Sequence, residues 1–143
     1  MSTSNQTPLK LWLAMTELVM DHKNLWRETF ESRLEVPFSR YRAMRRLERR
    51  ALTQRDLADL LHVDAPAASV IVTDLVDRGL VTRRPHPEDG RAKIVEITDS
   101  GRDWMEEVRS LPVAVPAAVD VLSAAERRDL ARLLAKMRDA GTA

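Results

Sequence analysis

Residues 63–101 constrain the fold of this chain most strongly, because signals for helix, turn and strand follow one another there without a gap. Asp64 is a favourable N-cap residue, and Pro66 falls in the first helical turn, where a missing N–H group costs little. Three apolar residues then recur at helical spacing: Val70, Ile71 and Leu75. Gly79 stands where a helix commonly ends in a left-handed residue. The pattern predicts a helix that begins after Asp64 and ends at Gly79.

A basic hairpin is predicted directly after this helix. Residues 80–84 and 91–98 both have the composition of strands. The segment between them ends in Asp89 and Gly90, a pair that favours a tight hairpin turn. We therefore expect two antiparallel strands with a short turn at the tip.

A second short helix is predicted just before the first. Thr53 is expected to cap it, and it should run to about His62, close to the N-cap at Asp64. Two short helices joined by so tight a turn are typical of a helix-turn-helix. With the hairpin, they predict a winged helix-turn-helix, mainly α-helical with a small β-hairpin wing.

Further helices are predicted on both sides of this region. A long helix opens at Pro8, and Thr98 should cap another, which Pro112 breaks and Pro116 restarts. Ser123 and Glu126 form a capping box for the last helix. The expected division is an N-terminal helix with its tail (1–36), a winged helix-turn-helix lobe (37–100) and C-terminal helices (101–143).

Composition excludes several other classes of protein. The 143 residues carry a formal net charge of +1, so any nucleic-acid binding must depend on local charge. There is no cysteine, which excludes disulfides and cysteine-based zinc sites. The sequence shows no signal peptide and no apolar run that spans a bilayer, so we expect a cytoplasmic protein without membrane partner, cofactor or metal.

Several motifs together resemble the MarR family, the multiple-antibiotic-resistance regulators. They are residues 38–44, residues 52–58, and residues 77–85 running into Asp89, Gly90 and Arg91, followed by residues 97–101. The resemblance implies a homodimer in which residues 1–36 and 101–143 supply dimerisation helices that intertwine, all within a single domain. It also implies that the two DNA-binding lobes (37–100) read a pseudo-palindrome in double-stranded DNA. It also implies a small phenolic or lipophilic effector, and hence a repressor that a ligand releases from its operator.

The predicted recognition helix is unusually apolar for this family. It lacks the polar run with a central arginine, and Asp74 stands where a second basic residue is common. Direct readout of bases normally uses Arg, Lys, Asn or Gln. The residues left as candidate DNA contacts are Pro66, Ala67, Ser69 and Thr73. Asp74 should be repelled by phosphate unless a nearby arginine pairs with it.

The wing offers stronger DNA-binding chemistry. Arg91 lies at the predicted hairpin tip, where it can enter a narrow minor groove, and Asp89 is expected to orient its guanidinium; the alternative is a surface ion pair between the two. The remaining candidates are phosphate contacts from the wing and from the N-terminus of the first short helix: Arg83, Arg84, Lys93, Thr53 and Gln54.

An effector pocket is a further hypothesis. Its candidate lining residues are apolar side chains of the first two helices: Trp12, Trp26, Phe30, Tyr41 and Met44. Core or dimer interface is the alternative for all five. Arg42 and Arg45, from a run of arginines between residues 40 and 50, could meet an effector carboxylate; a solvated basic face or a phosphate contact are the alternatives.

Catalysis has little support in the sequence. His22, His62 and His86 are far apart and have no nucleophile or metal-ligand spacing around them. This spacing gives no reason to expect an enzyme, and the family resemblance implies a ligand-responsive, DNA-binding transcriptional regulator. The alternative is a winged-helix module that binds proteins and no longer reads DNA sequence, which the apolar recognition helix favours.

Overall fold

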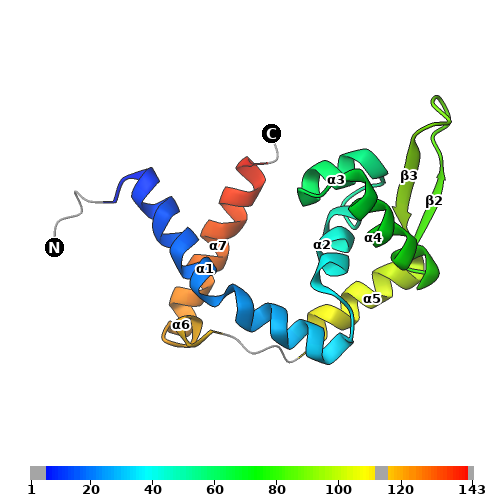
Figure 1. The fold of residues 1–143 in the computed structure, drawn as a ribbon. Coiled ribbons are helices and arrows are strands. Elements are labelled where there is room, and N and C mark those ends of the chain that lie inside the picture. Colours follow the sequence, from blue (N-terminus) through cyan, green and yellow to red (C-terminus); the bar gives the residue numbers. More distant parts are fainter. Residues whose placement is uncertain (1–5, 112–115, 142–143) are drawn as a thin grey trace. The chain divides into compact units, whose positions relative to one another are not determined.

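The computed structural model describes residues 6–111 and 116–141, apart from the side chains of Trp26 and Thr29. It is mainly helical with one small sheet (Figure 1). The elements in chain order are α1 (Pro8–Leu34), α2 (Phe38–Leu47), β1 (Leu52–Thr53), α3 (Gln54–Leu61), α4 (Ala65–Asp77), β2 (Val81–Pro85), β3 (Lys93–Ile97), α5 (Asp99–Ser110), α6 (Ala117–Asp120) and α7 (Ala124–Ala140).

The chain forms two compact units, which we call the central unit (Phe30–Pro112) and the terminal unit (residues 1–29 and 113–143). The sequence-based division lay at 36/37 and 100/101. The end of α1 and all of α5 group with the central unit because aromatic rings join them: the ring of Phe30 lies 5.0 Å from that of Tyr41 and 6.3 Å from that of Trp104. Phe30 is only 2% exposed.

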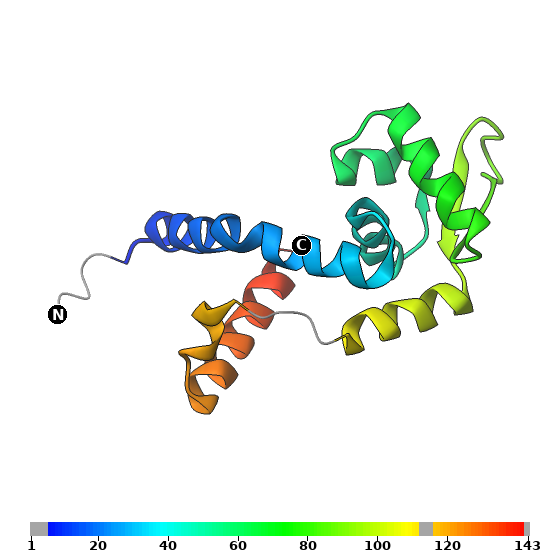
Figure 2. The same ribbon diagram turned by 60° about the horizontal axis from the view of Figure 1, so that its bottom comes forward.

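The main cluster of buried side chains in the central unit draws on all of its elements except the end of α1, whose buried Phe30 packs against Tyr41 and Trp104 beside it. In Figure 2, α2 lies between the α3–α4 pair and α5. Side chains from α2, α3, α4, the sheet and α5 fill the space between them, among them Met44, Leu57, Leu75, Val95 and Met105. Each of these five is at most 1% exposed, so α3 and α4 are held rigidly on the rest of the unit.

The sheet has three antiparallel strands in the order β1-β3-β2, not the two that the sequence predicts. β2 pairs with β3 from Val81 opposite Ile97 to Pro85 opposite Lys93. The added strand is β1, in which Leu52 lies opposite Val95. A two-residue strand has no periodicity of its own, and β1 exists only through its pairing with β3.

The predicted helix termini are confirmed. Thr53, Asp64, Thr98 and Ser123 each accept a hydrogen bond from the backbone N–H three residues later, as N-cap residues do. Gly79 has a φ of +73°, the left-handed conformation expected after α4. α3 ends slightly earlier than expected, at Leu61, because His62 is itself left-handed with a φ of +55°. α6 begins after Pro116, as predicted, and Pro112 lies outside the described residues.

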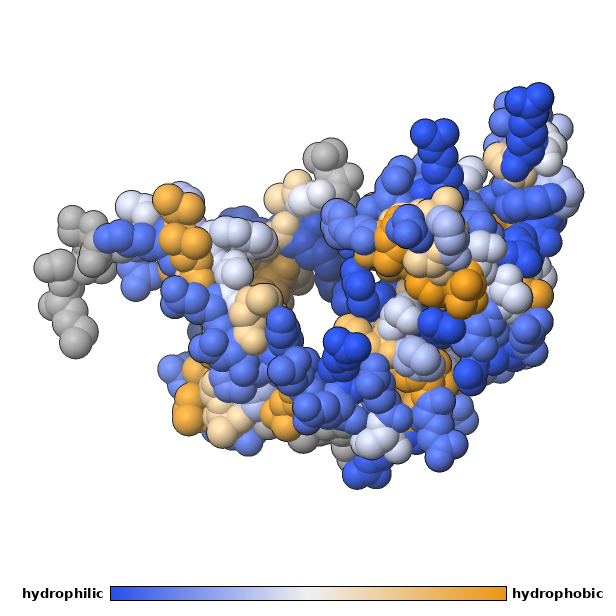
Figure 3. All heavy atoms as spheres, in the orientation of Figure 1, coloured by the Kyte–Doolittle hydropathy of each residue, from blue (hydrophilic) through white to orange (hydrophobic). Residues whose placement is uncertain are grey.

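The terminal unit has no buried residue in its described part. Many of its large hydrophobic side chains are exposed, and some appear in orange at the surface in Figure 3. They are Leu9, Leu11, Trp12, Leu13, Leu18, Val19, Met20 and Leu25 in α1, and Val119, Val121, Leu130, Leu133, Leu134 and Met137 around α6 and α7. Within residues 6–111 and 116–141, no helix combines the length and apolar character needed to cross a membrane.

Candidate nucleic-acid interface

The N-termini of α3 and α4 and one strand of the wing surround a single cleft. We use "wing" for β2, β3 and the loop of residues 86–92 between them, and "interface cleft" for this hollow of about 720 Å³. Its lining brings together Thr53 and Gln54 from the start of α3 with Arg91 and Lys93 from the wing. Four of the residues predicted as DNA contacts therefore share one surface.

The wing loop is built differently from the tight Asp-Gly turn expected. The ring Nδ1 of His86 accepts hydrogen bonds from the backbone N–H groups of Glu88 and Asp89, at 3.1 and 3.3 Å. The backbone N–H of His86 donates to Ala92 O at 2.9 Å and closes the loop. Gly90 has no positive φ, so its conformational freedom is not what forms the turn. A histidine ring replaces the glycine as the organising group.

The sequence suggested that Asp89 orients the guanidinium of Arg91, but in the structure it contacts the backbone of Arg91 instead. Its carboxylate accepts the backbone N–H of Arg91 at 3.1 Å and so fixes the main chain at the tip. Among the described residues, the guanidinium of Arg91 has no hydrogen-bond or ion-pair partner, and the side chain is exposed. The ion pair considered for these two residues is thus absent, and the guanidinium is available to a ligand.

A second, shallower hollow of about 540 Å³ runs along α4, and we call it the recognition groove. Three of the residues predicted as DNA contacts line it, Pro66, Ser69 and Thr73, whereas Ala67 is half-buried and does not. Two further predicted residues meet at its edge. One guanidinium nitrogen of Arg83 donates to Thr73 Oγ1 at 3.2 Å and to Gln54 Oε1 at 3.4 Å, which ties β2 to α3 and α4.

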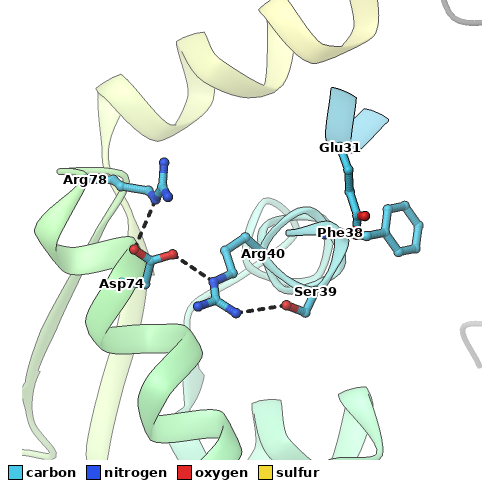
Figure 4. A network of polar contacts seen from close by, with 6 residues as sticks. All are labelled: Glu31, Phe38, Ser39, Arg40, Asp74 and Arg78. Carbon is cyan, nitrogen blue, oxygen red and sulfur yellow. Dashed lines mark hydrogen bonds and ion pairs between the residues drawn. The ribbon is translucent and has the colours of Figure 1, made fainter. Parts of the chain in front are cut away.

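Asp74 pairs with two arginines (Figure 4). Its carboxylate accepts hydrogen bonds from Arg40 Nε of α2 at 2.8 Å and from Arg78 Nε at 3.1 Å. The hydrogen bond from Arg40, opposed by desolvation and supported by Arg78, holds the pKa of Asp74 below its ordinary value. The carboxylate is therefore ionised at neutral pH but compensated. An acid on this helix needs an arginine partner to be tolerated near phosphate, and Asp74 has two.

The charges around the interface cleft are mixed. Arg84 forms an ion pair with Glu96 across the strands at 3.3 Å, which leaves Lys93 and Arg91 as the freer cations of the wing. Of the acids that line the cleft, Asp64 and Asp89 accept backbone N–H groups. Backbone N–H groups at the starts of α3 and α4 add positive potential to the cleft.

The residues predicted for an effector pocket belong to both units and differ in their burial. Phe30 and Met44 are buried in the core and Tyr41 packs against Phe30, whereas Trp12 is 60% exposed in the terminal unit. The side chain of Trp26 lies outside the described part. Arg42 and Arg45, with Arg46, Arg49 and Leu61, do line a small pocket of about 120 Å³. Arg42 donates to the carbonyl oxygen of Leu61 at 3.2 Å.

Sequence reasoning missed two features of this surface. It counted Val70 among the helix's apolar stripe, but Ile71 and Leu75 are buried while Val70 is 62% exposed in the recognition groove. It also left the partner of Asp74 unnamed, because Arg40 is distant in sequence. Among the described residues, no group of three or more histidines and acids could hold a metal ion.

Comparison with known proteins places this geometry in a family. Residues 34–92 match the MarR family. An uncharacterised helix-turn-helix-type transcriptional regulator of Bacillus subtilis, YdgJ, is 34% identical over 89 residues, which cover 62% of this chain and 54% of YdgJ. The chain thus spans about half the length of this relative, and less of the mycobacterial regulators that it also matches.

Solved structures agree over nearly the whole chain. A mutant of MepR from a multidrug-resistant S. aureus clinical isolate superposes with a TM-score of 0.78 at 22% identity, covering 95% of this chain and 99% of that one. A mutant of E. coli MarR complexed with operator DNA superposes with a TM-score of 0.59 at 26% identity, covering 91% of this chain and 93% of that one. Over residues 34–92 the chain matches the MarR family, and it has the winged helix-turn-helix fold of the solved MarR structures.

Proposed function

We propose that this chain is a sequence-specific DNA-binding transcriptional regulator that acts as a homodimer, most simply a repressor released by a small molecule. The observation that carries the proposal is the interface cleft, where two helix N-termini and the unpaired guanidinium of Arg91 lie on one surface. Helix N-termini and arginines are the groups that bind phosphates and enter DNA grooves. The MarR structure with operator DNA supports the same assignment.

The exposed hydrophobic side chains of the terminal unit support the homodimer. Of the large hydrophobic residues exposed in the described chain, every one except Val70 lies in α1, α6, α7 or the residues between α6 and α7. The described residues of this unit include no buried one and therefore form no core of their own. Apolar surface this extensive marks an interface between proteins. A second copy of the same helices is the partner we propose.

For the effector, we propose an anionic aromatic or lipophilic molecule. The support is the pocket formed by Arg42, Arg45, Arg46 and Arg49, which would bind a carboxylate. Phe30 and Met44 are buried in the core, so such a ligand could reach them only if the core opened.

A salt titration tests DNA binding. If each of two lobes neutralises at least two phosphates, log affinity should fall with log salt with a slope of about −3.6 or steeper. The measurement is fluorescence anisotropy of a labelled duplex at several salt concentrations. A flat dependence, or no binding at low salt, would instead favour the protein-interaction module.

A further inference from the structure

Val70 is the one large hydrophobic side chain that is exposed among the described residues of the central unit. It is 62% exposed in the middle of α4, while its neighbour Ile71 is 5% exposed. Pro66 lies one turn before it and Thr73 one turn after it, and all three line the recognition groove. The core therefore does not account for a valine at this position.

The other side chains of α4 offer little hydrogen bonding to bases. The helix contains no Arg, Lys, Asn or Gln, the residues that read guanine and adenine edges in the major groove. The hydroxyl of Thr73 already accepts a hydrogen bond from Arg83, and Asp74 is held by Arg40 and Arg78. What α4 presents at its centre is an apolar surface beside the single hydroxyl of Ser69.

We propose that Val70 is a specificity-determining residue that contacts the 5-methyl group of a thymine in the major groove. The proposal rests on the proposed function, since it requires α4 to lie against DNA. The thymine methyl is the apolar group that base edges expose in that groove, so it is the partner that matches a valine. The hydroxyl of Thr73, one turn further along α4, already accepts a hydrogen bond from Arg83 and so is less available to a base edge beside Val70.

The test removes the methyl group alone. In a duplex selected from random sequences for binding, each thymine is replaced in turn by deoxyuridine, which keeps the base pair. For the wild-type chain, one position in each half-site should weaken binding about three- to fivefold, the ratio expected for one buried methyl group. 5-Methylcytosine in a C·G pair at that position should bind more tightly than cytosine, because it presents the same methyl.

The Val70→Ala variant supplies the second arm. The variant should bind more weakly than wild type to the thymine duplex. For this variant, the ratio of the dissociation constants for the deoxyuridine and thymine duplexes should fall to nearly one, so that the effects of the two changes are not additive. Asp103→Ala, a truncation at an exposed residue of α5 that lines neither the recognition groove nor the interface cleft, should keep the full penalty.

Three results are distinguishable. An equal deoxyuridine penalty in wild type and Val70→Ala, or no penalty at any thymine, overturns the inference while the proposed function stands. Failure of the wild-type chain to bind any duplex overturns both. Circular dichroism spectra that match between wild type and Val70→Ala establish that the variant folds, as expected for an exposed side chain.

Discussion

Replacing Arg91 by alanine should weaken binding to a selected duplex by about 1–3 kcal/mol and leave the fold and the dimer intact. The guanidinium is exposed and has no hydrogen-bond or ion-pair partner among the described residues, so its loss breaks no such interaction within that part of the chain. Its backbone is held by Asp89 and the loop by His86, and neither interaction uses the side chain of residue 91. The measurement is the dissociation constant at fixed salt, with the thermal midpoint as the check on folding.

Arg102→Ala is the matched control for this variant. Arg102 is exposed on α5 and does not line the interface cleft, yet its removal changes the net charge by the same amount. Its effect on affinity should be much smaller than that of Arg91→Ala. Equal effects of the two variants would mean that only total charge matters, and that Arg91 at the wing tip makes no specific contact with DNA.

Replacing Gly101 by alanine should destabilise the central unit by about 1–3 kcal/mol. Intrinsic helix propensity alone favours alanine by up to about 1 kcal/mol inside a helix, so the predicted sign depends on packing. A Cβ at residue 101 would overlap the carbonyl oxygen of Leu80 and approach Ile97 Cγ1 to 2.7 Å and Met44 Cε to 3.0 Å. The Leu80 carbonyl is fixed, because it accepts the backbone N–H of Thr98 at 3.0 Å.

Gly90→Ala is the control for this substitution. A Cβ at Gly90 would meet nothing within 4 Å, and the residue has no positive φ. Urea unfolding followed by circular dichroism, at one protein concentration because of the proposed dimer, compares the variants. A Gly101→Ala chain as stable as wild type would show that α5 can shift away from Leu80 at little cost.

The sequence predicted those parts of the fold that depend on local chemistry. N-caps at Thr53, Asp64 and Thr98, and the left-handed Gly79, follow from one or two side chains and the backbone that they cap. Local patterns carry no information on the strand at Leu52, whose conformation comes from pairing with a distant strand.

The candidate site shows the same limit. Arg91, Lys93 and the start of α3 were predicted individually, and the structure places them around one cleft. The exposure of Val70 was not predictable, because periodicity places a valine on a helix without stating which neighbours cover it. The role of His86 in the wing loop depends on the path of a backbone that composition only partly determines.

Selection of binding sites from a random DNA pool tests the central claim most directly. The full chain is incubated with random duplexes, and the bound fraction is amplified and sequenced over several rounds. The account predicts enrichment of two inverted half-sites centred about 10 bp apart, as two lobes of a dimer require. A pool that remains unenriched, or one that yields a single unpaired half-site, would contradict a homodimer that reads DNA sequence.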